Sequence, residues 1–155
     1  MGKLDLVVGK KLVLKKVLVK QLNSIKMENL DNEIKKFYQQ LKLLNVQMFG
    51  PLITRNKGTN IHEDGTVTVD YELYTQAHDY QQYSQQFESH EEIRVENCLY
   101  IRFSDSPEYL ELAHAKMNVF IYEENIPVKE DIYTVFVSGD EKQMVVDIFK
   151  PVGSL

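Results

Sequence analysis

The sequence has one cysteine, no tryptophan, and only seven glycines and four prolines among its 155 residues. A lone cysteine, Cys98, excludes an internal disulfide framework and favours a reducing, cytoplasmic compartment. A thiol nucleophile would also need a positioned base, which a sequence does not show. No stretch approaches the roughly 18 uninterrupted apolar residues of a membrane-spanning helix, so we expect no membrane segment.

Motifs for phosphate, metal and nucleophilic chemistry are also missing. There is no phosphate-binding glycine loop and no Gly-x-Ser-x-Gly elbow. His62, His78 and His90 stand in polar segments without HxH or HExxH spacing, and we expect them in loops. Glu111 and His114 form a Glu-x-x-His pair, which binds metal only when other helices supply matching ligands. We therefore expect His114 to be a packed or surface histidine, and we predict no metal and no cofactor.

Positive charge is concentrated in one segment. The net charge of −5 argues against a nucleic-acid surface, since phosphate binding needs a dominant basic face. The first twenty residues are the local exception, with Lys3, Lys10, Lys11, Lys15, Lys16 and Lys20. We interpret this run as a solvated strand face, the alternative being a nucleic-acid or membrane patch. Because lysines interrupt this segment throughout and no small-residue cleavage site follows it, we do not expect a signal peptide.

The first half predicts the order strand, helix, strand, strand. Residues 11–21 are rich in Val and Leu and predict a strand. The helix that follows can be capped by Asn23 or Ser24 and should be stopped by Gly50 and Pro51. Its apolar stripe consists of Leu30, Ile34, Phe37, Leu41 and Leu44. Residues 51–58 and 66–75 predict two antiparallel strands, and the polar segment 76–92 is a connection or an edge strand.

The second half repeats this order. Residues 94–103 predict a strand, Ser106 and Pro107 mark the start of a helix, and residues 131–137 and 143–151 predict two more strands. The repetition predicts an α+β fold made of a duplicated β-α-β-β unit, with antiparallel strands and two helices. We expect a single domain over residues 1–155, with pseudo-repeats at about 11–76 and 94–152.

An acid occurs at the same place in both repeats. From Val67 to Gln76 apolar and polar residues alternate, yet Glu72 stands among Tyr71, Leu73 and Tyr74. When the closing strands of the two halves are aligned, Glu72 matches Asp147. A carboxylate in an apolar layer is costly unless something pairs with it. Each acid therefore either faces solvent or meets a partner that the sequence does not name.

These segments resemble the GyrI-like small-molecule-binding domain, also known as the effector-binding domain of AraC- and MerR-type regulators. The resemblance rests on "NCLYIRFSDSP", "FIYEENIPV", "DIYTVFV" and "VVDIFKPV", which follow in the family's order, and on "GPLITRNKG" and "VDYELYTQ" in the first half. It covers residues 11–152. No helix-turn-helix segment precedes it in this sequence, so we do not expect a one-chain transcription factor, and the tryptophan of some members is absent.

The resemblance implies a ligand cleft between the two helices, lined by aromatic rings and a buried acid. Members often bind hydrophobic, frequently cationic compounds there, and rings and carboxylates both attract such cations. Carried over to this sequence, the acids are Glu72 and Asp147, the latter shorter than the usual Glu. The candidate rings are Tyr71, Tyr74, Tyr100, Phe103, Tyr122, Tyr133, Phe136 and Phe149.

Three functions compete at this point. The first is a standalone, non-enzymatic domain that binds a hydrophobic or cationic small molecule. The second is a protein-interaction or inhibitor module that uses the cleft or a sheet edge. The third is a hydrolase in the same cleft, with Glu72 as general base if burial raises its pKa. A continuous apolar patch outside the cleft would favour the second function.

Overall fold

The computed structural model describes residues 4–127, 131–140 and 142–153. Its strands are β1 (Leu6–Lys26), β2 (Met48–Ile61), β3 (Val67–Ala77), β4 (Glu88–Asp105), β5 (Ile132–Gly139) and β6 (Met144–Pro151), and its α-helices are α1 (Leu30–Leu43) and α2 (Leu110–Glu123). Short 3-10 helices occupy Met27–Asn29, Tyr80–Tyr83 and Pro107–Tyr109. The predicted α+β fold with its duplicated β-α-β-β unit is therefore confirmed.

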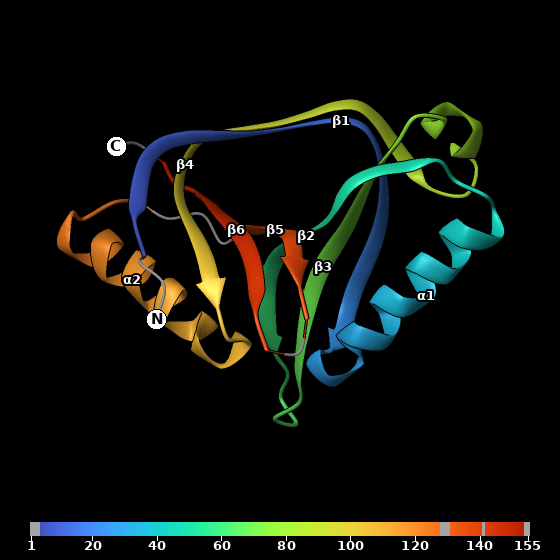
Figure 1. Cartoon of the computed structure of the whole chain (residues 1–155). Helices are drawn as coiled ribbons and strands as arrows, with labels where there is room; N and C mark the ends of the chain where they lie inside the picture. The colour runs from blue at the N-terminus through green and yellow to red at the C-terminus, as the bar shows by residue number, and fades with distance from the viewer. Residues whose placement is uncertain (1–3, 128–130, 141, 154–155) are drawn as a thin grey trace.

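The six strands form a closed antiparallel barrel in the order β1-β3-β2-β5-β6-β4. Two seams join the halves, since β2 pairs with β5 and β1 pairs with β4. Figure 1 shows the long strands β1 and β4 arching together above the others, with α1 and α2 on opposite outer sides. Every strand has a neighbour on both sides, but β1 pairs with β3 only from Val17 onward and β4 pairs with β6 only from Cys98 onward. The described sheet therefore keeps edge segments that are paired on one side only, and the sheet-edge alternative stays a prediction.

The apolar side chains form three clusters. One lies under α1, where Leu18 and Leu73 pack against Phe37, and a second lies under α2, where Ile101 and Ile148 are fully buried. The third contains residues from strands alone and fills the inside of the barrel, with Leu12, Leu14, Val17, Val19, Ile53, Tyr74, Cys98, Tyr133 and Phe149. The central strands are therefore buried on both faces, unlike the half-buried strand that the alternation in β3 predicts.

An asparagine two residues beyond the last residue terminates each helix, and α1 does not extend to the predicted Gly50 and Pro51. Asn45 and Asn125 have φ angles of 56° and 52°, in the left-handed region that ends a helix. The amide of Val46 then donates to the carbonyl of Leu41 at 3.0 Å, and Asn125 is followed by an equivalent bond. Gly50 and Pro51 lie in β2, beside a shift in its register to β3.

The starts of the elements differ as well. Asn23 and Ser24 belong to β1, which runs to Lys26, and they cap no helix. Ser106 and Pro107 do begin a helical segment, but its first turn is a 3-10 helix and Ser106 makes no side-chain capping bond. The segment 76–92 contains the end of β3, a 3-10 helix and the start of β4.

The basic N-terminal segment lies on β1, apart from Lys3, which is outside the described residues. Lys10, Lys11, Lys15 and Lys16 are exposed, as predicted for a solvated strand face. None of the helices in the described part of the chain is long and apolar enough to cross a membrane.

Candidate functional site

A cleft of about 1100 Å³ opens between α1 and α2 on the outer face of the barrel. Its floor is formed mainly by β2 and β5, and its walls are the facing sides of the two helices. Most of the lining is apolar or aromatic: Met27, Leu30, Ile34, Tyr38, Pro51, Leu52, Tyr71, Leu110, Met117, Ile132, Phe136 and Val137. The predicted cleft between the helices is thus present, and its size and lining are typical of small-molecule sites.

The acidic and basic groups among the described lining residues of the cleft are few. Asp31 and Glu111 are exposed acids on the two helices, whereas Lys150 is buried at 8% exposure. Half-buried His114 also lines the cleft, as a packed histidine. Burial lowers the pKa of His114, the charge of Lys150 lowers it further and Glu111 opposes this, so the imidazole is neutral at pH 7.

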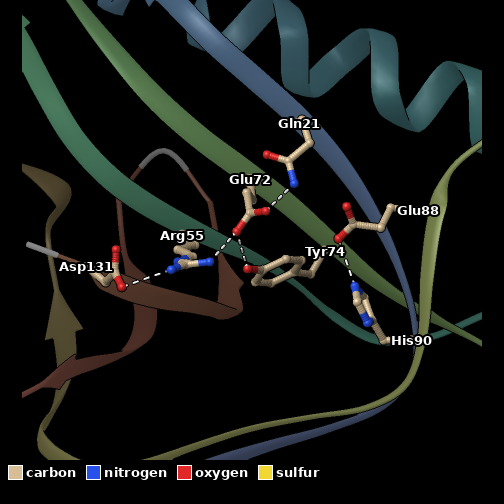
Figure 2. A network of polar contacts seen from close by, with 7 residues as sticks. All are labelled: Gln21, Arg55, Glu72, Tyr74, Glu88, His90 and Asp131. Atoms are coloured by element: carbon tan, nitrogen blue, oxygen red, sulfur yellow. Dashed lines mark hydrogen bonds and ion pairs between the residues drawn. The ribbon is translucent and has the colours of Figure 1, made fainter.

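Glu72 lies on the opposite face of the sheet, inside the barrel, and its carboxylate has three protein partners (Figure 2). Nη1 of Arg55 donates to it at 2.6 Å and the hydroxyl of Tyr74 at 2.8 Å, and the amide of Gln21 donates to its other oxygen. Arg55 also bonds Asp131 at 2.9 Å, and its guanidinium lies 5.5 Å from the ring centre of Tyr133. The buried acid therefore meets a partner within the chain.

These contacts set the protonation states of the group. Burial would raise the pKa of Glu72, but the hydrogen bonds from Tyr74, Arg55 and Gln21 outweigh it and hold the pKa below its usual value. Burial also raises the pKa of Tyr133 to about 12. Glu72 is thus ionised at neutral pH and ion-paired, so the condition for its predicted role as a general base, a raised pKa, is not met.

Asp147 repeats this arrangement in the second half. Its carboxylate accepts hydrogen bonds from Nε and Nη2 of Arg102, at 2.7 and 2.9 Å, and from the Tyr100 hydroxyl at 2.8 Å. Burial raises its pKa, and the bonds from Arg102 and Tyr100 outweigh that effect, so the net shift is downward. Lys10 lies 5.4 Å from the centre of the Tyr100 ring.

The structure divides the predicted site residues between several places. Glu72, Asp147, Tyr74, Tyr100, Tyr133 and Phe149 come together on the inner side of the barrel. The interhelical cleft, which was expected to hold the whole set, contains Tyr71 and Phe136. Phe103 is core beneath α2, at 1% exposure, and Tyr122 is 87% exposed on the outside of α2. The predicted rings and acids therefore do not form one interhelical site.

Sequence reasoning missed the two arginines. Arg55 stands directly across from Glu72 in the pairing of β2 with β3, and Arg102 directly across from Asp147 in the pairing of β4 with β6. The available signal was one arginine within "PLITRNKG" and one within "LYIRF", although β4 also contains Arg94. It also missed the helical wall of the cleft, where Tyr38 and Met117 supply apolar surface.

Residues considered for metal or thiol chemistry are placed as follows. Within the described residues no group of three or more His, Cys, Asp or Glu side chains could hold a metal ion. Cys98 is fully buried inside the barrel. His62 and His78 lie outside the strands, whereas His90 is on β4 and pairs with Glu88 at 2.8 Å (Figure 2), so its assignment to a loop is wrong.

Among the comparisons with known proteins, only the one with solved structures finds proteins that share this fold. No family model matches the sequence. No curated protein matches it either.

Several solved structures share the fold. The crystal structure of the EcmrR C-terminal domain matches with a TM-score of 0.68 at 11% identity, over 99% of this chain and 98% of that one. In the EcmrR–DNA complex the TM-score is 0.75 at 10% identity, and the match covers 98% of this chain but only 58% of EcmrR.

Two further similar structures carry functional descriptions. SAV2435 bound to tetraphenylphosphonium matches with a TM-score of 0.55 at 11% identity, over 98% of this chain and 94% of that one. A protein described as a hydrolase from Listeria innocua matches with a TM-score of 0.52 at 8% identity, over 97% and 92% of the two chains. At these identities the likeness shows the fold alone. The chain therefore has the fold of the EcmrR C-terminal domain, and its resemblance to the GyrI-like domain is confirmed at the level of the fold.

Proposed function

We propose that this chain binds a hydrophobic small molecule, preferentially a cation, in the cleft between α1 and α2. The observation that carries the proposal is the cleft itself, about 1100 Å³ with a largely apolar lining. Apolar surface at its floor and on both walls would remove most of a lipophilic ligand's surface from water, which is the main favourable term in such binding. The rings of Tyr38, Tyr71 and Phe136 offer aromatic faces to a delocalised charge.

The charges of the cleft support a cation over an anion. Asp31 and Glu111 are the acids among the described lining residues, and Lys150 is the basic residue that remains charged when His114 is neutral. Over these described residues the sum of the formal charges at neutral pH is negative. The structure of SAV2435 bound to tetraphenylphosphonium gives a second support, since a chain of the same fold holds a lipophilic cation.

Tetraphenylphosphonium and tetraphenylborate make a matched test, because they have nearly the same shape and opposite charge. We expect the phosphonium to raise the thermal unfolding midpoint more than the borate does. At about a hundred times its dissociation constant a ligand adds about 2.7 kcal/mol to the free energy of unfolding. At this chain length that corresponds to a shift of several degrees.

Substitutions locate the binding site. Thr134 lies on the cleft floor, so Thr134→Trp should fill the cleft and abolish the shift, whereas Lys35→Trp on the exposed outer side of α1 should leave it unchanged. Glu72→Gln, inside the barrel, should also retain it. Loss of the shift in Glu72→Gln alone would place the ligand inside the barrel, and the absence of any shift with either ion would refute binding of this ligand class.

A further inference from the structure

Helix α2 is apolar on two opposite sides. Ala113 and Met117 pack against the core on the inner side. On the outer side Leu112, Ala115, Val119 and Tyr122 are exposed and follow the three- and four-residue steps of one continuous stripe. Val119 is 54% exposed and Tyr122 87%. The corresponding outer side of α1 carries Asn32, Lys35, Lys36 and Gln39 instead, so this apolar stripe is particular to the second repeat.

The stripe continues onto the N-terminal strand. Leu4 and Leu6 run beside α2 and, with Leu112, Val119 and Phe120, line a shallow groove of about 480 Å³. Figure 1 shows the first part of β1 next to this helix. Helix and strand together thus make one apolar surface outside the cleft, of the kind that marks a partner-binding site. We call it the α2 outer surface.

The charges at the edge of this surface are self-complementary. Lys116 and Glu123 lie on the same side of the stripe, two helical turns apart, and both are exposed. The ammonium of Lys116 donates to the carbonyl of Leu4, which holds it at that edge. If two copies of α2 pack antiparallel about a two-fold axis near Val119, each Lys116 faces Glu123 of the other copy, and the apolar stripes face each other.

We infer that the α2 outer surface binds the same surface of a second copy of this chain, giving a two-fold dimer. A self-complementary pattern is what an isologous interface requires, because the same patch must serve both partners. The inference is independent of ligand binding, since His114 and Met117 still face the cleft from the other side of the helix.

Charge reversal tests the inference. Sedimentation equilibrium of the full chain should show a concentration-dependent dimer. Lys116→Glu and Glu123→Lys should each weaken it at least about tenfold, because both attractive pairs become repulsive. The double variant Lys116→Glu/Glu123→Lys restores both pairs across the two-fold axis and should restore the dimer. Lys35→Glu, an equally exposed reversal on α1, is the control and should have no effect.

Two results would overturn the inference. One is a wild-type chain that stays monomeric to high concentration. The other is a double variant that dimerises no better than the single variants. The swap restores the two ion pairs only if residue 116 of one copy faces residue 123 of the other. Thermal unfolding midpoints of all variants check that the exposed substitutions leave the fold intact. Val119→Glu, at the proposed axis, should abolish the dimer by placing a charge in the apolar stripe.

Discussion

At the scale of single residues, both repeats contain the acid, but the arginine that pairs with it comes from a different strand of each repeat. Glu72 is paired with Arg55 from β2, while the facing residue on β1 is the neutral Gln21. Asp147 is paired instead with Arg102 from β4, the counterpart of β1 in the second half. Each carboxylate is thus neutralised, but from opposite sides. A ligand cation would have to compete with an arginine for either acid, which is why we propose the cleft rather than the barrel interior as the ligand site.

The Arg55–Glu72 pair should make a measurable contribution to stability. Arg55→Met keeps most of the side-chain volume but leaves the Glu72 carboxylate, 7% exposed, without its cation. We expect a loss of about 2 to 4 kcal/mol in the free energy of unfolding from urea denaturation, somewhat less than for a fully buried pair because Arg55 is 27% exposed.

A double-mutant cycle isolates the pair. Glu72→Gln combined with Arg55→Met should cost clearly less than the sum of the single changes, since no unpaired charge then remains. Arg102→Met at the 54% exposed arginine of the second pair is the matched control, and we expect a loss of at most about 1 kcal/mol. Additive effects of the Arg55 and Glu72 substitutions would contradict a coupled ion pair.

At the scale of elements, the helix ends depend on asparagine in the left-handed conformation. Asn45 has a φ angle of 56°, which costs an alanine roughly 1 kcal/mol and glycine nothing. Asn45→Ala should therefore lower the free energy of unfolding by about 1 kcal/mol, whereas Asn45→Gly should leave it equal or slightly higher. Urea denaturation measures both.

A helical asparagine provides the control. Asn32 is exposed within α1, so there the order should reverse, with Asn32→Gly destabilising by about 1 kcal/mol relative to Asn32→Ala. If both positions ranked glycine and alanine in the same order, the left-handed helix end would not be supported.

Element types were predictable from the sequence and their ends were not. Apolar residues such as Ile34, Phe37 and Leu41 recur at helical spacing, and that periodicity found α1 correctly. The helix end escaped prediction because Asn45 takes a conformation that glycine more commonly supplies. Asn23 has the composition of a cap, yet the pairing of β1 with β3 continues to Lys26 and overrides that local preference.

The chemistry of the site was less predictable because it depends on sheet register. Glu72 and Asp147 were identified as buried acids, but their arginine partners lie on other strands. The β2–β3 pairing shifts between Phe49 and Ile53, so sequence spacing alone does not place Arg55 opposite Glu72. Nor does alternation along β3 tell which face looks into the barrel and which into the cleft.

At the scale of the whole molecule, closure of the barrel makes the two repeats depend on each other. Strand β1 pairs with β3 of its own repeat and with β4 of the other, and β2 pairs with β5 across the second seam. The inner cluster draws Val17 and Tyr74 from the first repeat and Tyr133 and Phe149 from the second. A single repeat would expose this inner face to water and leave two strand edges unpaired.

Splitting the chain tests this dependence. We expect fragments 1–87 and 88–155 each to lack a cooperative thermal transition when alone, because each loses both seams and half of the inner cluster. Mixing them should restore the transition and the circular dichroism spectrum of the intact chain. The control is a cut that gives fragments of the same two lengths, 1–68 and 69–155, but interrupts β3. Mixing these fragments should restore less of the thermal transition. Cooperative unfolding of either repeat as a monomer would instead show that it buries a sufficient core of its own, under α1 or α2, without the barrel interior.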